Sequence, residues 1–273
     1  MKPHTTPVDE NKLSQMKLIF HEIQTIYDAG TPLFTKDNIR EVGKQLQRFQ
    51  KGERDGGNTI LKGVNGIDYE VFIEPRSRDP PRENEHVGGS KWIIIYSSIK
   101  HLTTYIDVPF FNLQSAYLPM RIVAPIALLS NRPEYTKPPA PPAPPAEDFG
   151  TYQALEREWR TSQHYERLQE MLATIVFPFT LTKVIGLALG ALVIRSQVCE
   201  STVLQHALVS ALHSTLVQRG ILSASSKQYV QDPIYTQRDR EILHSAGLTV
   251  LDDPQALLDL DESSVLFESK TDD

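Results

Sequence analysis

Short apolar runs alternate with helical patterns over residues 183–269. The first run ends in a glycine turn, and the second ends on a carboxylate, Asp232. Strands that alternate with helices in this way are typical of a parallel sheet. We therefore predict an α/β fold with a Rossmann-like, mostly parallel sheet in the C-terminal half. The predicted strands lie within residues 183–190, where the glycine turn closes the strand, and at 229–232, 248–251 and 264–267.

A different pattern fills the N-terminal part of the chain. Apolar residues first recur at helical spacing and then alternate with polar ones, as expected of helices followed by strands. Asn65-Gly66 lies between two strand-like runs and is a strong signal for a tight hairpin. We predict a smaller α+β module over residues 1–132. Its predicted elements are helices 12–29 and 36–50 and strands 59–64, 67–73 and 92–96.

A proline-rich run, residues 138–145, separates the two patterns. Such a run forms an extended polyproline II segment of about 3 Å per residue, which suits a stiff spacer. Its PxxP spacings leave a ligand for SH3 or WW domains as the alternative. We predict a linker at 133–150, followed by a domain at 151–268 that opens with a helix over 151–173. The acidic end, 269–273, is expected to be disordered.

The charge distribution argues against nucleic-acid binding. The net charge is -6, and about eight acids against one lysine follow residue 251. The rest of the chain is close to neutral and has no long basic stripe, so no nucleic-acid partner is expected.

Cysteine content and hydropathy bear on location. Cys199 is the single cysteine, which suits a reducing compartment. The N-terminus lacks the apolar core of a secretory signal. The most apolar window, 176–194, contains Pro178 and Lys183, and a lysine in the middle of a membrane helix costs about 3 kcal/mol. We therefore expect no membrane segment and a location in the cytoplasm or the nucleus.

The glycine turn is the first candidate for binding chemistry. Backbone N–H groups between a strand and a helix can bind a phosphate, and the helix dipole favours an anion there. From Gly186 the chain reads G-x-A-x-G-A, with Ala188 where the dinucleotide fingerprint needs its second glycine. Gly190 can still provide the tight turn. Cofactor binding and close packing of helix on strand both remain open for these glycines.

Asp232 is the second candidate. A carboxylate at the end of a strand binds ribose hydroxyls in Rossmann-like sites. Its distance from the glycine turn is about twice the usual 20 or so residues, although the polar loop 223–226 can absorb the difference. The alternative is a plain turn, because Asp before Pro often starts one.

Other reactive residues give weaker signals. His206 and His213 are seven residues apart and share a helix face, but a zinc site needs further ligands nearby. Hydrogen-bonded, partly buried histidines are the simpler interpretation, and Cys199 is interpreted as packing. The chain has no G-x-S-x-G elbow, P-loop or H-E-x-x-H. We therefore predict no metal site and no catalytic residue.

Several short motifs in the C-terminal part form an ordered set. They are Gly186-Leu187-Ala188-Leu189-Gly190, Gln205-His206, Gln231-Asp232-Pro233-Ile234-Tyr235-Thr236 and Ile242-Leu243-His244-Ser245-Ala246-Gly247. In order and spacing, residues 155–268 resemble the Sensitivity-to-Red-light-Reduced family. The helix that carries Trp159, Ser162 and Tyr165 resembles that of fungal-type members. The family continues past its fourth strand, whereas this chain ends soon after Phe267, so a C-terminally shortened domain is expected.

The resemblance implies a regulatory role. Family members are linked to light signalling and circadian control, to cytoskeletal and stress phenotypes, and to haem-linked regulation, without a shared established reaction. The first hypothesis is thus a regulatory or interaction protein with protein partners and no catalysis of its own. The second is an enzyme that binds a nucleotide or S-adenosylmethionine-type cofactor, whose identity stays open. Its candidate cofactor-binding residues are Gly186, Gly190, Gln205, His206, Asp232 and Tyr235.

Overall fold

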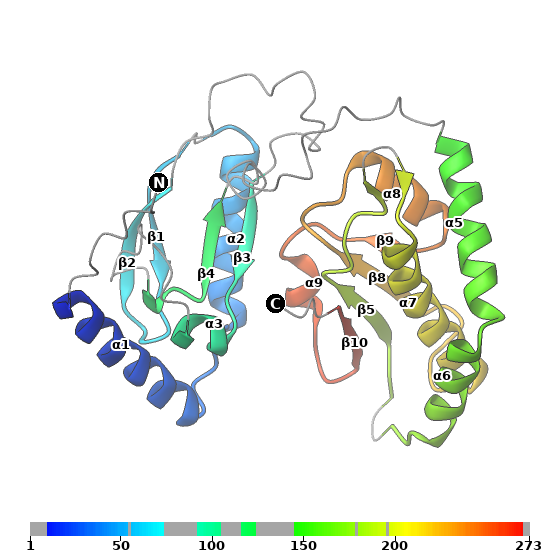
Figure 1. Cartoon of the computed structure of the whole chain (residues 1–273), viewed down its shortest axis with the longest axis horizontal. Coiled ribbons are helices and arrows are strands. Elements are labelled where there is room, and N and C mark those ends of the chain that lie inside the picture. The colour runs from blue at the N-terminus through cyan, green and yellow to red at the C-terminus, as the bar shows by residue number, and fades with distance from the viewer. Residues whose placement is uncertain are drawn as a thin grey trace, which may run out of the picture. The chain divides into compact units, whose positions relative to one another are not determined.

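The computed structural model describes residues 10–53, 56–73, 92–104, 116–123, 145–177, 180–194 and 197–269. Most of the proline run (138–144) and the last four residues, 270–273, lie outside these ranges, so the predicted spacer and the predicted disorder of the tail stay predictions. The described elements form two compact units, one from α1 to β4 and one from α5 to β10 (Figure 1).

The N-terminal unit combines helices with two short antiparallel sheets, β1-β2 and β3-β4. Its elements are α1 (Glu10–Asp28), α2 (Lys36–Gln50), β1 (Gly57–Lys62), β2 (Asp68–Ile73), β3 (Ile93–Tyr96), α3 (Ile99–Thr104) and β4 (Met120–Val123). The predicted helices, hairpin and third strand are therefore confirmed. Gly66 has a φ of 78°, a left-handed conformation that the hairpin turn needs and that glycine adopts without strain.

The buried face of α2 organises the core of the N-terminal unit. Thr35 caps the helix, its hydroxyl accepting from Asn38 N at 3.2 Å. Leu46 and Phe49 are buried, and the Phe49 ring lies 4.9 Å from that of the buried Trp92. This aromatic contact connects α2 to the residue that precedes β3.

The C-terminal unit has a four-stranded sheet in the order β10-β5-β8-β9, and every pairing in it is parallel. The elements are α5 (Pro145–Arg160), α6 (Gln163–Thr174), β5 (Lys183–Leu187), β6 (Val193–Ile194), β7 (Gln197–Val198), α7 (Glu200–Gln218), β8 (Lys227–Gln231), α8 (Gln237–Ser245), β9 (Thr249–Val250), α9 (Gln255–Asp259) and β10 (Ser264–Glu268). The predicted α/β fold with a parallel C-terminal sheet and a smaller α+β part is confirmed.

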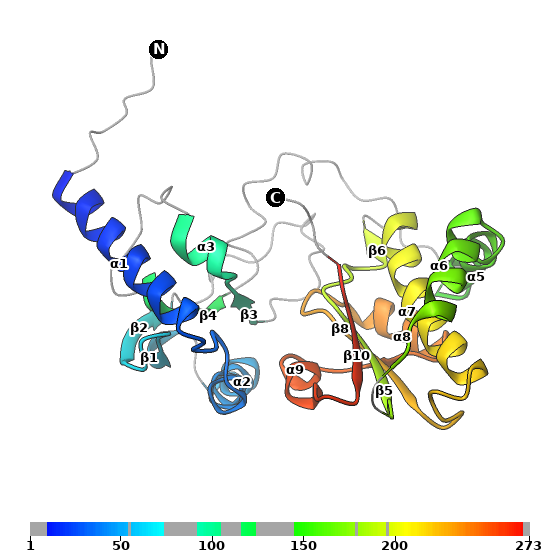
Figure 2. The same cartoon turned by 90° about the horizontal axis from the view of Figure 1, so that it is seen from below.

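Successive residues of β5 supply the two faces of this sheet. Val184 belongs to the larger core, beneath α5, α7 and α8, whereas Ile185 and Leu187 pack with Ala256 on the other face, under α9. Figure 2 shows α9 on one side of the strands and α7 and α8 on the other. A strand buried on both faces explains why the residues of β5 after Lys183 are all apolar.

The predicted helix over 151–173 is wrong in one respect, because two helices occupy this stretch. α5 ends at Arg160, and Ser162 starts α6 by accepting at its hydroxyl from Tyr165 N at 3.3 Å. A serine favours such a cap over a helix interior because its side chain satisfies an otherwise unpaired backbone N–H. α5 begins at Pro145, so residues 145–150 of the predicted linker are helical.

Among the described helices, none has both the length and the hydropathy needed to cross a membrane.

Candidate functional site

The predicted glycine turn lies at the carboxyl end of β5, beside the carboxyl end of β8. Ala188 has a φ of 55° and Gly190 a φ of 79°. The left-handed conformation is ordinary for glycine but costs about 1–2 kcal/mol for a residue with a Cβ. Ala188 N donates to Gln231 O at 3.1 Å, which holds the turn against β8. The strand ends that form ligand sites in open parallel sheets therefore meet here.

Gly186 lies under helix α7 and has no room for a side chain. A Cβ there would lie 2.8 Å from both Leu189 Cδ1 and Val209 Cγ2. Gly186 thus lets α7 approach β5 closely, as close packing of helix on strand requires.

Asp232 binds the glycine turn directly. One carboxylate oxygen accepts from Gly190 N at 2.8 Å, and the other accepts from Ile234 N at 3.0 Å. Burial raises the pKa of Asp232, while the two backbone N–H groups act in the opposite direction. Thr202 of α7 covers the turn, because a Cβ on Gly190 would lie 3.0 Å from its Cγ2.

His206 and Tyr235 form a buried hydrogen-bonded pair next to Asp232. His206 Nδ1 lies 2.6 Å from Thr202 O, and Nε2 lies 2.7 Å from the Tyr235 hydroxyl. A carbonyl only accepts, so Nδ1 carries the proton and the neutral ring accepts from Tyr235 at Nε2. Burial lowers the pKa of His206 to about 4 and raises that of Tyr235.

Asp239 is a member of this network that the sequence analysis missed. It is fully buried, and one carboxylate oxygen accepts from Val193 N at 2.9 Å. The other accepts from Thr236 N at 2.7 Å and from the Thr236 hydroxyl at 2.6 Å. The T-x-x-D spacing is a capping-box variant that could have identified Asp239 as the start of α8. Its contact with Val193, 46 residues away, has no local signal.

The structure thus brings five of the six predicted residues together. Gly190 bonds to Asp232, and Tyr235 follows Asp232 and bonds to His206, while Gly186 lies four residues before Gly190, within β5. Gln205 is half-buried on α7, and its side chain is not part of this network in the described part of the chain.

Two hydroxyls beside the network are buried without a hydrogen-bond partner among the described residues. They are Tyr152 Oη on α5 and Ser210 Oγ, one helical turn after His206 on α7. Ser210 lies near enough to Tyr152 to act on the pKa of its hydroxyl, but the two groups do not meet the geometry of a hydrogen bond. Burial raises the pKa of Tyr152. A buried hydroxyl without a partner costs about 1–3 kcal/mol.

The site has the chemistry of a closed hydrogen-bonded network. Asp232 occupies the backbone N–H of Gly190, the group that a phosphate would use, and its own position disfavours an anion there. Within the described residues, no group of three or more His, Cys, Asp or Glu side chains could hold a metal ion.

Comparison with known protein families gives one match. Residues 168–268 match the SRR1 domain. The match runs from within α6 to the end of β10 and includes all four strands of the parallel sheet. It therefore supports an SRR-like domain in the C-terminal unit. No curated protein and no solved structure matches the chain.

Proposed function

We propose that the chain is a regulatory or interaction protein, a fungal-type member of the SRR-like family. In this proposal the SRR1 domain works through protein partners in the cytoplasm or nucleus, without a reaction of its own. The observation that carries it is the 2.8 Å hydrogen bond between Gly190 N and the Asp232 carboxylate.

This bond opposes a nucleotide in the expected place. Rossmann-like sites place a phosphate on free N–H groups of the glycine turn and keep the carboxylate for ribose hydroxyls. Here the Asp232 carboxylate itself accepts from the N–H of Gly190 in the turn, and Thr202 packs over Gly190. A phosphate would have to displace a buried carboxylate that already has two backbone donors.

An exposed apolar group at the C-terminal end of α6 supports the interaction role. Met171 and Ile175 are four residues apart, hence on one side of the helix end, and Val176 follows. Their exposed fractions are 56%, 37% and 89%. Adjacent exposed apolar side chains of this kind are common at protein–protein contacts.

The test is a thermal-shift screen of the purified full chain with S-adenosylmethionine, NAD(H), NADP(H), FAD, ATP and haem. A ligand at 100 times its Kd stabilises a protein by about 2.7 kcal/mol. In a chain of this length, 1 kcal/mol moves the midpoint by about 2–4 °C. We expect no shift with any of them. A shift of several degrees that Asp232→Ala or Gly190→Val abolishes would overturn the proposal.

A nucleotide- or S-adenosylmethionine-dependent enzyme is the second candidate, and one observation favours it. The buried His206–Tyr235 pair lies beside Asp232, Asp239 and the orphaned hydroxyl of Tyr152. Buried titratable groups with displaced pKa values concentrate at functional sites. For this enzyme the thermal shift would appear in the parent chain, weaken in His206→Gln and survive in His164→Gln, an exposed control.

A further inference from the structure

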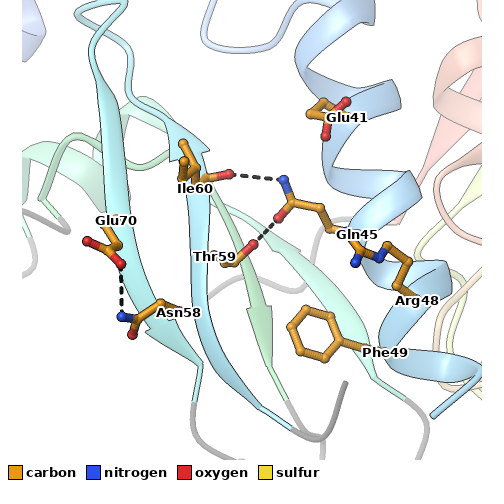
Figure 3. A pocket seen from close by; sticks show the side chains of 8 residues that line it. All are labelled: Glu41, Gln45, Arg48, Phe49, Asn58, Thr59, Ile60 and Glu70. Carbon is orange, nitrogen blue, oxygen red and sulfur yellow. Dashed lines mark hydrogen bonds between the residues drawn. The ribbon is translucent and has the colours of Figure 1, made fainter. Parts of the chain in front are cut away.

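The N-terminal unit has a cavity between helix α2 and strand β1, outside the residues that match the SRR1 domain. Its volume is about 450 Å³, within the usual range of about 300–1,000 Å³ for ligand sites. Figure 3 shows α2 on one side of it and the hairpin on the other. Its lining residues are Glu41, Gln45, Arg48 and Phe49 from α2, Asn58, Thr59 and Ile60 from β1, and Glu70 from β2. We call this cavity the α2–β1 groove.

The outer edge of β1 forms one wall of the groove. In a strand, alternate residues direct their backbone groups to opposite sides. Gly63 N donates to Ile67 O at 2.8 Å, so the backbone N–H and C=O groups of the odd-numbered residues of β1 point towards β2. The backbone groups of Ile60 therefore point away from β2, and its carbonyl accepts a hydrogen bond from α2 across the groove.

A side-chain amide occupies that edge. Gln45 Nε2 donates to Ile60 O at 3.0 Å, and Gln45 Oε1 accepts from the Thr59 hydroxyl (Figure 3). A carboxamide has the same donor and acceptor as a peptide group. The Gln45 N–H thus occupies the place of the backbone N–H that a third strand would donate to Ile60 O, while the amide oxygen bonds to a side chain of β1 and not to its backbone.

The surroundings define what kind of strand would fit. The buried Phe49 ring gives the groove an apolar floor. The lining carries two carboxylates, Glu41 and Glu70, against one guanidinium, Arg48, whose Nε lies 3.5 Å from Glu53. Lys44 lies 3.4 Å from Glu41, but both side chains are mostly exposed, and such pairs contribute little.

The face of the hairpin continues this pattern. Glu70 lies opposite Ile60 across the β1–β2 pairing, and the Ile60 side chain is 59% exposed. A strand added beside β1 would alternate one side chain towards Phe49 with one towards Ile60 and Glu70. Apolar residues fit the first position, and basic residues fit the second.

We propose that the α2–β1 groove binds an extended peptide segment with alternating apolar and basic residues. The segment displaces the Gln45 amide and adds a third strand to β1. Main-chain hydrogen bonds give affinity in this mode and alternate side chains give specificity. This site lies in the N-terminal unit and goes beyond the function proposed for the SRR1 domain.

The test uses the full chain with Trp159→Phe, which leaves Trp92 as the single tryptophan. Trp92 contacts Phe49 at 4.9 Å between ring centroids, so its fluorescence reports on the groove. The probe is a positional-scanning library of acetylated, amidated octapeptides. We expect selection of Lys or Arg at alternate positions and apolar residues between them.

Two variants then test the geometry with the selected peptide. Glu70→Lys should raise its Kd at least tenfold and shift the library preference to acidic residues, whereas Asp28→Lys on α1 should change the Kd less than twofold. Gln45→Ala should lower the Kd several-fold, because no side-chain amide then competes for Ile60 O. Glu70 is exposed, and circular dichroism checks that the variant folds.

Either of two results would overturn the proposal. One is a library with no positional preference. The other is a selected peptide whose Kd responds neither to Glu70→Lys nor to Gln45→Ala. Neither result bears on the cofactor screen, which concerns residues of the other unit.

Discussion

Polar groups are used in opposite ways at the carboxyl ends of the parallel strands and in the α2–β1 groove. Beside the carboxyl ends of the strands, Asp232 and Asp239 accept hydrogen bonds from backbone N–H groups of distant segments and are themselves buried. In the groove, Gln45 is half-buried and satisfies a strand edge beside a 450 Å³ cavity. A buried carboxylate that holds several donors is costly to remove, whereas a half-exposed amide is readily replaced by an incoming peptide group. The first arrangement stabilises the fold, and the second is suited to binding.

The largest loss of stability is expected for Asp239→Ala. The change leaves Val193 N and Thr236 N without their acceptor in a fully buried place. We expect the free energy of unfolding to fall by about 3 kcal/mol, as for a broken buried charged network. Urea unfolding at pH 7 measures it. Glu262→Gln, which changes an exposed carboxylate of the same unit, is the control and should stay within about 0.5 kcal/mol.

Asp232→Ala should cost somewhat less, about 2 kcal/mol, because it removes the acceptor of two backbone N–H groups, those of Gly190 and Ile234. The raised pKa of Asp232 means that its charged form already costs some stability at neutral pH, which offsets part of the loss. The same urea series measures it. A change below about 0.5 kcal/mol would show that Asp232 does not hold the glycine turn in a closed network.

His206→Gln separates hydrogen bonding from charge through its pH dependence. At pH 7 the variant should be about 1 kcal/mol less stable, because it imperfectly replaces the bonds to Thr202 O and Tyr235. The pKa of His206 is lowered to about 4 from 6.5, so the unfolded chain binds the proton first on acidification. The parent chain should lose about 2 kcal/mol through this residue by pH 5.

The variant lacks this loss, so the order of stabilities should reverse between pH 7 and pH 5. Unfolding curves at both values decide it, with His164→Gln as the exposed control. If the free energies of unfolding of the parent and the variant change by the same amount between pH 7 and pH 5, His206 is not held neutral by burial.

The smallest effect on stability is expected in the groove. Gln45→Ala removes two side-chain hydrogen bonds, one to Ile60 O on the exposed side of β1 and one from the buried Thr59 hydroxyl. The free energy of unfolding should fall by no more than about 1 kcal/mol, less than for Asp232→Ala. Thermal unfolding of the full chain measures it. A loss as large as that of Asp232→Ala would mean that Gln45 is a structural bond, and the contrast between the two regions would fail.

Local pattern predicted the elements of both units well. Helical spacing located α2, and Asn65-Gly66 located the hairpin, because side-chain periodicity and turn conformation are properties of neighbouring residues. The break at Ser162 was missed because apolar residues continue at helical spacing on both sides of it. Serine marks a helix start only weakly when the pattern around it does not change.

The sequence by itself determined the parallel sheet, its glycine turn and the group of residues at the carboxyl ends of its strands. Each follows from hydrophobicity, chain order and the fact that parallel strands end on the same side. Only the tertiary structure decided how these residues are used. Asp232 meets Gly190 across 42 residues and Asp239 meets Val193 across 46, and the α2–β1 groove depends on how a helix packs beside a strand edge. Such contacts depend on packing between distant segments, and no local pattern in the chain encodes them.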